Sequence, residues 1–488
     1  MLKREQFYYV KRLSLWKPLF FIYLIMLLSR LFVLCYYRQV NVKIGDKGGI
    51  EVTFERLGTM KTSQEGHLEI GGVDTIKLAE KYGTPLYVYD VALIRDRARG
   101  FKRTFEEMGI TAQVAYASKA FSAIAIYQLM AEEGLSVDVV SGGELYTAIK
   151  AGFPAELIHF HGNNKTREEI EMALDYEIGC IVVDNFYEID LLKTILSERQ
   201  QKVSVLVRVT PGIEAHTHDY ILTGQEDSKF GFGLDNGQAE KALQLLLQDS
   251  AYFDVKGLHC HIGSQIFETT GFKVAAHRVM DKLVEWRDAF GFKASVLNLG
   301  GGFGVRYTAD DEPLEPAEYV RQIILEVKEV AQQNELAVPE IWIEPGRALV
   351  GEAGTTLYSI GSRKEVPGIR DYIAVDGGMN DNIRPALYDA KYEAVIANHP
   401  EKAAEETVSI AGKCCESGDM LIWDIPLPNM QSGEILAVFC TGAYGYAMAS
   451  NYNRICRPAV VFVENGIDKL VVARETYDDL IQNDLSLF

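Results

Sequence analysis

The sequence lacks a Cys-x-x-Cys motif, and its seven cysteines are an odd number scattered along the chain. This pattern does not suit a disulfide framework or a zinc site, and it is typical of a protein in the reducing cytosol. Low-complexity tracts are absent as well. With 48% apolar and 24% charged residues over 488 positions, the chain can bury a large core, and its length predicts two or three domains.

Basic residues are in the minority. Lysine and arginine number 49 against 68 acidic residues, which gives a formal net charge of −19. Binding to nucleic acid or to an anionic membrane needs clustered basic side chains, so this charge argues against both partners. A small anionic substrate is compatible with it, because a few buried arginines are sufficient to bind one.

An uninterrupted membrane span is also missing from the first fifty residues. The apolar stretches 18–28 and 31–37 are separated by Ser29 and Arg30. A span needs roughly 20 apolar residues, and an arginine in its middle costs about 2.5–3.5 kcal/mol. The residues after the second stretch are bulky and offer no small-residue site for cleavage of a signal peptide.

Two hypotheses account for residues 1–59. In the first, they come from an over-extended reading frame and lie outside the natural protein. The Lys-Gly-Gly peptide at 47–49 can be encoded by a purine-rich ribosome-binding sequence, and Val52 and Met60 are candidate start positions downstream. The alternative is a real membrane anchor. The first hypothesis is preferred, so no membrane association is expected.

Beyond residue 60 the chain alternates between short apolar runs and helix-like segments. Eight such runs are found, at 113–117, 137–140, 157–161, 180–183, 203–209, 255–261, 296–299 and 341–344. Short, wholly apolar runs are typical of buried parallel strands. Eight strand–helix units predict an α/β fold, a (β/α)8 barrel, with a doubly wound sheet as the rival architecture.

After about residue 351 the alternation stops. Strand-like runs at 372–375, 406–410, 435–439 and 459–463 are separated by glycine-rich turns, with little helix between them. This pattern predicts a mostly β second domain, built from residues 60–90 and 347–488, beside a barrel of residues 91–346. No proline- or serine-rich linker separates the two, so we expect them to pack closely.

Lys119 lies directly at the end of the first barrel strand, in Tyr-Ala-Ser-Lys. The catalytic face of a barrel is formed where its strands end. A lysine there is a candidate for Schiff-base chemistry, because its amine loses its proton readily when it is desolvated. The alternative is a surface lysine that opens the next helix.

A glycine cluster, Gly300-Gly-Gly-Phe-Gly304, follows the seventh strand. Glycines let the backbone approach a phosphate and present N–H groups to it. The cluster does not match G-x-G-x-x-G, since Val305 stands in place of the last glycine. It is not a Walker loop either, because no Gly-Lys-Ser/Thr follows. The sequence therefore predicts a phosphate-binding turn, with a tight structural turn as the alternative.

Histidines and a carboxylate stand at two other strand ends. His259 and His261 alternate, so both can point to one side of the strand. A metal pair is conceivable, although no third ligand stands at a suggestive spacing, and stacking on an aromatic cofactor would explain one of them. Glu344 could hold a pyridine nitrogen protonated, and Arg347 could bind a phosphate or carboxylate, or the two could form a structural ion pair.

The second domain adds three candidate groups. Cys415 and Glu416 lie in Cys-Cys-Glu-Ser-Gly-Asp, where a thiol could donate a proton, although a buried and inert cysteine is the common case. Arg384 and Tyr388, four residues apart, could bind a substrate carboxylate. Tyr444 could reach a phosphate. Each signal is weak when taken alone.

Taken together, these peptides resemble a known family. The ordered motifs Tyr-Ala-Ser-Lys, Ser-Gly-Gly-Glu, His-Gly-Asn-Asn-Lys, His-Cys-His-Ile-Gly-Ser-Gln, Gly-Gly-Gly-Phe-Gly, Glu-Pro-Gly-Arg, Cys-Glu-Ser-Gly-Asp and Gly-Ala-Tyr-Gly are similar to those of the diaminopimelate decarboxylases. These are alanine-racemase-like, fold-type III enzymes that depend on pyridoxal 5'-phosphate. The resemblance runs from about residue 66 to near the C-terminus. It implies decarboxylation of meso-2,6-diaminopimelate to L-lysine, the last step of lysine biosynthesis.

The resemblance also implies roles. Lys119 would carry the cofactor as a Schiff base, His261 would stack on its ring, and Glu344 would pair with the ring nitrogen. The cofactor phosphate would be held by Ser264, Gly301, Gly302, Glu344, Pro345, Gly346, Arg347 and Tyr444. The retained part of the substrate would bind Arg347, Arg384, Tyr388, Glu416 and Tyr444.

In this family the counterparts of Cys415 and Glu416 reach the pocket from a partner subunit, which implies an obligate homodimer. Cys415 would return a proton to the carbon that has lost CO2. Relatives that act on ornithine, lysine or arginine usually carry aspartate at the position of Glu416, so diaminopimelate is the preferred substrate. A decarboxylase of one of those amino acids, a non-catalytic cofactor-binding protein and a membrane-anchored binding protein are the alternatives.

Overall fold

The computed structural model describes residues 42–44, 50–52, 56–213 and 227–488. The hypotheses for residues 1–59 therefore fall largely outside the described residues. Within that segment, β1 (Val42–Ile44) and β2 (Ile50–Val52) pair in antiparallel fashion. In the part of the chain that is described, no helix has both the length and the apolar character needed to cross a membrane.

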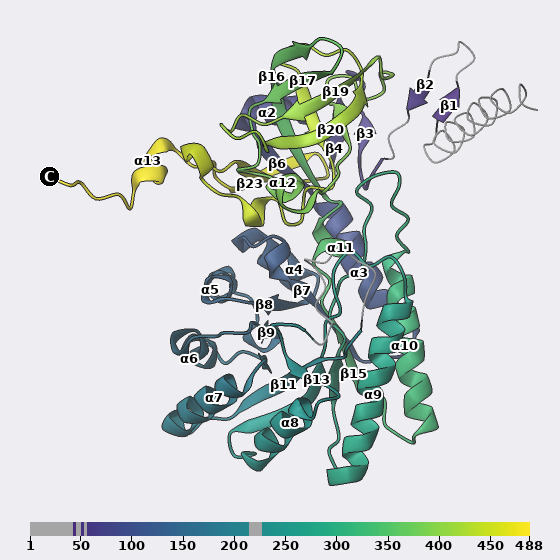
Figure 1. The fold of residues 1–488 in the computed structure, drawn as a ribbon, viewed down its shortest axis with the longest axis vertical. Helices are drawn as coiled ribbons and strands as arrows, with labels where there is room; N and C mark the ends of the chain where they lie inside the picture. Colours follow the sequence, from purple (N-terminus) through teal and green to yellow (C-terminus); the bar gives the residue numbers. More distant parts are fainter. Residues whose placement is uncertain (1–41, 45–49, 53–55, 214–226) are drawn as a thin grey trace, which may run out of the picture.

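Eight parallel strands close into a barrel, in the lower half of Figure 1. The closing pairs are β15 with β7 and β10 with β11. This confirms the predicted (β/α)8 barrel and excludes a doubly wound sheet, which has open edges. In chain order the strands are β7 (Ala112–Ala117), β8 (Ser136–Val139), β9 (Ile158–Phe160), β10 (Cys180–Val183), β11 (Val203–Thr210), β13 (Phe253–His259), β14 (Val296–Asn298) and β15 (Glu340–Ile343).

Helices surround the barrel and cover its strands (Figure 1). Several begin at polar caps just after a strand ends: the side chains of Ser141, Thr166 and Asn185 each accept a hydrogen bond from a backbone N–H in the first turn. Such caps fix how the chain leaves the barrel mouth. The helices are α3 (Val91–Glu107), α4 (Ile124–Glu132), α5 (Gly142–Ala151), α6 (Arg167–Asp175), α7 (Phe186–Arg199), α8 (Gln238–Gln248), α9 (Thr270–Phe290) and α10 (Pro316–Gln333).

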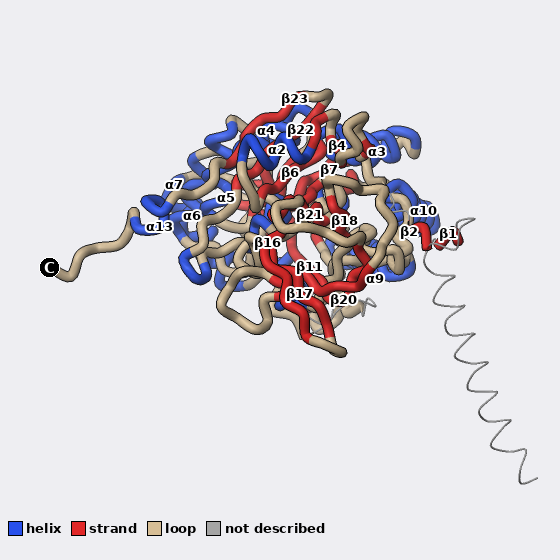
Figure 2. The backbone as a smooth tube through the Cα atoms, turned by 90° about the horizontal axis from the view of Figure 1, so that it is seen from above, coloured by secondary structure: helices blue, strands red, loops and turns tan. Residues whose placement is uncertain are grey.

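The remainder is mostly β and lies above the barrel in Figure 1; Figure 2 shows its strands from above. Strand β6, which precedes the barrel in sequence, pairs antiparallel with β16 and parallel with β22. Segments from both sides of the barrel sequence thus form one sheet. Its strands are β6 (Leu86–Asp90), β16 (Gly354–Val366), β17 (Arg370–Val375), β18 (Ala394–Ile396), β19 (Glu406–Ala411), β20 (Met420–Leu427), β21 (Ile435–Val438), β22 (Ala459–Glu464) and β23 (Ile467–Val472).

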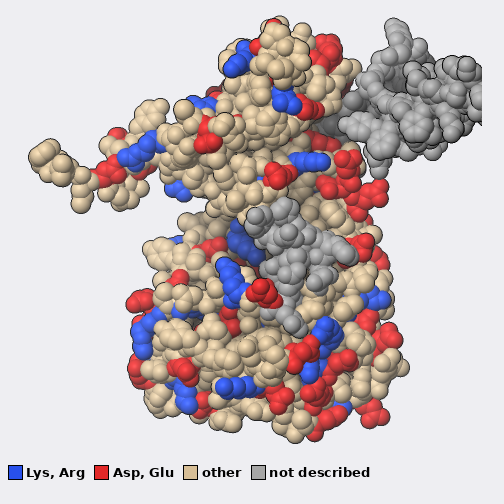
Figure 3. All heavy atoms as spheres, viewed as in Figure 1, with Lys and Arg blue, Asp and Glu red and all other residues tan. Residues whose placement is uncertain are grey.

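Short elements complete the described chain. A small sheet of β3 (Lys61–Thr62), β4 (Leu68–Ile70) and β5 (Val73–Asp74) precedes α2 (Thr75–Tyr82). Strand β12 (Phe232–Gly233) pairs with the end of β11. Three short helices are α11 (Arg347–Val350), α12 (Arg384–Tyr388) and α13 (Tyr477–Ile481). On the face drawn in Figure 3, acidic and basic side chains are interspersed over the described residues.

The lysine of the His-Gly-Asn-Asn-Lys motif has a structural position. Lys165 is buried, and its Nζ donates hydrogen bonds of 2.8 Å to the carbonyls of Gly162 and Val182 and to Glu188. A buried ammonium is stable only when its donors are paired in this way. Lys165 therefore joins the ends of β9 and β10 and holds the loop that carries His161.

Candidate active site

Polar groups gather where the barrel strands end. Because all eight strands run in the same direction, their carboxyl ends meet at one mouth. Lys119 follows β7 in the short 3-10 turn Ser118–Ala120. The other groups come from five further strand ends and are Asp138, His161, His259, His261, Asn298 and Glu344.

The side chain of Lys119 is solvent-exposed, but its charge acts on groups at the mouth. Burial, followed by the charge of Lys119, lowers the pKa of His261 well below its usual value. Burial raises the pKa of the Asp138 carboxyl to about 6, against the opposing charges of His161 and Lys119. The charge of Lys119 therefore reaches groups at or just after the ends of two other strands of the barrel, β8 and β13.

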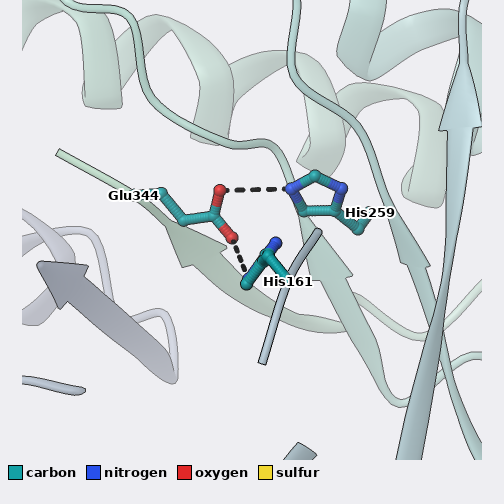
Figure 4. A group of neighbouring side chains, drawn as sticks. All are labelled: His161, His259 and Glu344. Carbon is teal, nitrogen blue, oxygen red and sulfur yellow. Dashed lines mark hydrogen bonds and ion pairs between the residues drawn. The ribbon is translucent and has the colours of Figure 1, made fainter. Parts of the chain in front are cut away.

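Glu344 is the centre of a buried hydrogen-bonded group, drawn in Figure 4 with its two histidines. The Nε2 atom of His259 lies 3.1 Å from Oε2, and Nε2 of His161 lies 3.2 Å from Oε1. The Nδ2 amide of Asn298 donates to Oε1 at 2.6 Å. Burial favours the protonated form, but the adjacent histidines hold the pKa of Glu344 well below its usual range.

The sequence spacing of His259 and His261 showed no third ligand for a metal ion. In the structure, His161 and Glu344 approach His259 from other strand ends. Ligand atoms of His161, His259 and Glu344 lie within 4.8 Å of one another, a separation that a metal ion could bridge. The observed contacts are hydrogen-bond and ion-pair distances between the side chains themselves. We therefore interpret the group as an environment for the carboxylate.

The glycine cluster packs directly against neighbouring backbone. A Cβ atom on Gly301 would lie 2.0 Å from the Glu344 carbonyl oxygen, and one on Gly302 would lie 2.1 Å from that of Gly263. The φ angle of Gly302 is +104°, which also favours glycine. The N–H of Gly301 donates to Nδ1 of His261 at 3.2 Å, so the turn fixes the histidine ring.

Arg347 joins the loop after β13 to the β-rich part. It is buried, and its Nη2 donates to the hydroxyl of Ser264 at 3.0 Å. Its guanidinium lies 4.9 Å from the ring centre of Tyr444. Although burial opposes the change, the charges of Arg347 and Lys119 lower the pKa of Tyr444. Ser264, Arg347 and Tyr444 thus form one cluster, as their predicted common role requires.

A second buried arginine, Arg384, contacts the first through a tyrosine. The hydroxyl of Tyr307 accepts hydrogen bonds from Arg347 Nη1 and from Arg384 Nη1, the latter at 2.9 Å, and Tyr392 also accepts from Arg384 at 2.9 Å. Within the described residues, neither arginine forms an ion pair with a carboxylate, and Nε of Arg347 has no hydrogen-bond partner. Two buried cations without a counter-charge form a site for an anion.

The predicted groups of the second domain are only partly brought to this site. Tyr388 ends α12 and is half-buried. Cys415 and Glu416 are exposed on the turn between β19 and β20, and they form hydrogen bonds with Asn453, Ser417 and Gly418, which are not barrel residues. Asp419 holds this turn by accepting from the backbone N–H groups of Cys414 and Met379.

Sequence reasoning missed several residues of the site. Tyr307 and Tyr392, which hold the arginines, carry no motif of their own, and only the fold places them together. Asp138 and Asn298 each stand at the end of a barrel strand, so the rule that chemistry gathers at strand ends could have found both. His161 stands in the His-Gly-Asn-Asn-Lys motif, but no role for it was predicted from the sequence.

Comparison with known proteins decides the family. The sequence profile described as "Pyridoxal-dependent decarboxylase, pyridoxal binding domain" matches residues 91–351, more than half of the chain. A diaminopimelate decarboxylase of Bacillus methanolicus is 70% identical over 418 residues, covering 86% of this chain and 96% of the relative. The chain belongs to the diaminopimelate decarboxylases.

Two further members of the diaminopimelate decarboxylases agree with this assignment. The protein of Bacillus subtilis (strain 168) is 68% identical over 428 residues, covering 88% of this chain and 97% of that one. A diaminopimelate decarboxylase of M. jannaschii, solved in complex with L-lysine, is 38% identical with a TM-score of 0.81, covering 88% of this chain and 98% of that one. The predicted family, fold, enzyme class and pyridoxal phosphate cofactor are confirmed.

The residues at the barrel mouth fit this cofactor. A buried carboxylate suits a protonated pyridine nitrogen, and the cluster of Ser264, Arg347 and Tyr444 beside the glycine turn suits a phosphate. The Nε of Arg347 adds a donor that has no acceptor among the residues that the structure describes. The charge of Lys119 reaches His261 and Tyr444, so an amine that could attach the cofactor lies in the same region.

Proposed function

We propose that this enzyme converts meso-2,6-diaminopimelate to L-lysine and CO2, and that the barrel mouth is its active site. The observation that carries the proposal is 70% identity to a diaminopimelate decarboxylase over 86% of the chain. The pair of buried arginines supports it, because they suit a substrate that retains a carboxylate after CO2 has left. The solved M. jannaschii relative holds L-lysine, the expected product.

Bound pyridoxal phosphate supplies the conjugated ring that accepts the electron pair left by CO2. The chain's residues bind and orient it. Lys119 offers the amine that attaches the cofactor, Glu344 faces the ring nitrogen, and His261 covers the ring. The phosphate contacts come from Ser264, Gly301, Gly302, Pro345, Gly346, Arg347 and Tyr444.

The substrate is oriented through the end that does not lose CO2. Arg347 and Arg384, together with Tyr388 and Tyr444, bind the carboxylate that is retained. Glu416 binds the distal amino group, and the Cys415 thiol donates a proton to the carbon that has lost CO2. Because both are exposed on a turn whose hydrogen bonds are with Asn453, Ser417 and Gly418 rather than with barrel residues, we propose that they serve the site of a second subunit in a homodimer.

The division of the chain follows from the same proposal. We assign residues 91–346 to the cofactor-binding barrel, and residues 60–90 and 347–488 to a β domain that carries Cys415 and Glu416. The pairing of β6 with β16 and β22 supports this division. The six described cysteines are free thiols, which supports a cytoplasmic location.

Substrate competition tests the function. Purified holoenzyme would be incubated with meso-diaminopimelate, ornithine, arginine and lysine in parallel, and CO2 release would be followed. We expect turnover of diaminopimelate alone. Preferred turnover of one of the other three would assign the enzyme to the alternative substrate class, and no turnover of any would favour a cofactor-binding protein.

The attachment residue gives a second test. Lys119→Ala should remove the visible absorption band of the bound cofactor, and borohydride should no longer fix the cofactor to the chain, while circular dichroism is unchanged. Decarboxylation should fall by at least about a thousandfold, because the variant loses a residue that contacts the reacting group. Borohydride labelling at another lysine would remove Lys119 from its proposed role.

A further inference from the structure

The surroundings of Glu344 select one ionic form of its carboxyl group. An ionised carboxylate offers about four acceptor positions, whereas the protonated acid must use one oxygen as a donor. Nitrogen atoms of Asn298 and His259 form hydrogen bonds at two of these positions. Nε2 of His161 approaches Oε1 at an ion-pair distance of 3.2 Å, without hydrogen-bond geometry. The arrangement therefore leaves at least about one position for a further donor.

Asn298 is a fixed donor in this group. Its Oδ1 accepts a hydrogen bond from the N–H of Gly300 at 2.9 Å, so its Nδ2 must be the atom that faces Glu344. The amide alone satisfies only one of the two carboxylate oxygens. His259 is the protein group that contacts Oε2, and His161 makes a second approach to Oε1 (Figure 4).

We propose that His161 and His259 are positioning residues that keep Glu344 ionised, so that it can hold the pyridine nitrogen of the cofactor in its protonated form. The inference rests on the proposed function, which brings that nitrogen to Glu344. Neither histidine contacts the reacting atoms in this account. They act through the carboxylate, whose charge makes the ring an effective acceptor of electrons.

Two positioning residues are needed because Glu344 is buried. Glu344 is about 7% exposed, and a carboxyl group in a dry site takes up a proton unless hydrogen-bond donors or positive charges surround it. A protonated Glu344 could no longer balance a pyridinium. Other described titratable groups whose charges act together with that of Glu344 include Asp138, His159, Arg208, Cys260 and His261.

Nuclear magnetic resonance of the holoenzyme tests the inference. The cofactor would be labelled with 15N at its ring nitrogen, whose chemical shift separates the protonated from the neutral pyridine. The wild-type enzyme should show the protonated form at pH 7. The double variant His161→Leu/His259→Leu should show the neutral form, and kcat for diaminopimelate should fall by about a hundredfold with little change in KM.

Three further variants sharpen the result. His161→Gln and His259→Gln each place an amide donor near the position of the histidine Nε2. These variants should therefore show the signal of the protonated ring nitrogen, which the leucine variants lose. His159→Leu is the matched control: it removes a buried histidine that stacks on Trp342 and makes no hydrogen bond to Glu344. If the leucine variants do not fold, His259→Asn replaces them, because its shorter amide should not reach the carboxylate.

A protonated nitrogen in the leucine or asparagine variants would overturn the inference, and so would a neutral nitrogen in the wild-type enzyme. Loss of the resonance of the protonated ring nitrogen in the glutamine variants would also contradict the inference. These outcomes do not depend on the substrate. If the wild-type enzyme shows the expected resonance but does not turn over diaminopimelate, the proposed function fails and the role of the histidines stands.

Discussion

At the residue scale, the most unusual contact is the hydroxyl of Tyr307 between two guanidinium groups. Arg347 and Arg384 are both buried, and like charges at short range repel each other. The shared hydroxyl accepts from both, which fixes the distance between their donors. Tyr307 therefore sets the geometry of the anion site without belonging to any motif that sequence reasoning identified.

Tyr307→Phe tests this role. A hydrogen bond to a charged group contributes about 1.5–3 kcal/mol, so losing the shared acceptor should raise KM for diaminopimelate by about tenfold or more. The value of kcat should change much less, because in the proposed function the arginines bind a part of the substrate that does not react. Tyr319→Phe is the matched control, since its hydroxyl donates to the Phe267 carbonyl, away from both arginines. An unchanged KM in Tyr307→Phe would contradict the role.

A second residue links stability to pH. Asp381 is fully buried, and burial raises the pKa of its carboxyl to about 7. Between about pH 4, its unfolded value, and pH 7, the native state binds more protons than the unfolded state. The contribution of Asp381 to the free energy of unfolding therefore decreases as the pH rises through this window, and does not change further above it.

Urea denaturation of Asp381→Asn at pH 5 and pH 8 measures that contribution. The free energy of unfolding of the wild-type protein, minus that of the variant, should be larger at pH 5 than at pH 8. The reason is that only the wild type carries a buried carboxylate at the higher pH. Asp96→Asn, at an exposed position of α3, is the control. A difference that is independent of pH in Asp381→Asn would contradict the assignment.

At the scale of elements, the glycine turn after β14 is packed so closely that no side chain fits. Its neighbours are the carbonyl groups of Gly263 and Glu344, which belong to the loops after β13 and β15. Three consecutive strand ends are therefore held together by direct backbone packing. This explains why a run of glycines is found here.

Gly302→Ala should disturb this packing. Its Cβ would lie 2.1 Å from the Gly263 carbonyl oxygen, and its φ of +104° is strained for alanine. We expect at least about tenfold weaker binding of pyridoxal phosphate, measured by absorbance titration, and a lower melting temperature. Gly100→Ala in α3, where nothing lies within 4 Å of the new Cβ, should instead stabilise the protein by about 0.5–1 kcal/mol.

The local sequence pattern was sufficient to predict the strands of the barrel. Each predicted strand overlaps an observed one, because a buried parallel strand is continuously apolar and the helix after it starts at a polar cap. Strand β16 was missed: its last residues, from Gly361 on, are mostly exposed and charged. Its position is set by pairing with β6, β17 and β21, which no local pattern reveals.

At the scale of the whole molecule, the exposed turn that carries Cys415 and Glu416 is the main argument for a dimer. Both side chains are exposed, and the turn is fixed from within its own domain by Asp419 and Asn453. A twofold axis would place each such turn at the barrel mouth of the other subunit, since a closed dimer makes every contact twice. Two complete sites then require two chains.

Mixed dimers test this arrangement. Lys119→Ala and Cys415→Ala would each be expressed alone and then together. Each variant alone should be slow, and Cys415→Ala should retain the cofactor band. Random mixing should restore about a quarter of wild-type activity, because about half of the dimers are mixed and each of these has one intact site. No recovery, in samples shown by mass spectrometry to contain mixed dimers, would place both residues in one chain's site.

The sequence by itself determined the barrel, the order of its motifs and part of the groups at its mouth, among them Lys119, His261 and Glu344. Periodicity and capping act over a few residues, and the parallel direction of the strands then brings their ends to one face. Only the tertiary structure decided which groups contact each other. His259 and Glu344 are 85 positions apart, and Tyr307 and Arg384 are 77 apart. Contacts at such separations depend on how whole elements pack, which no local pattern records.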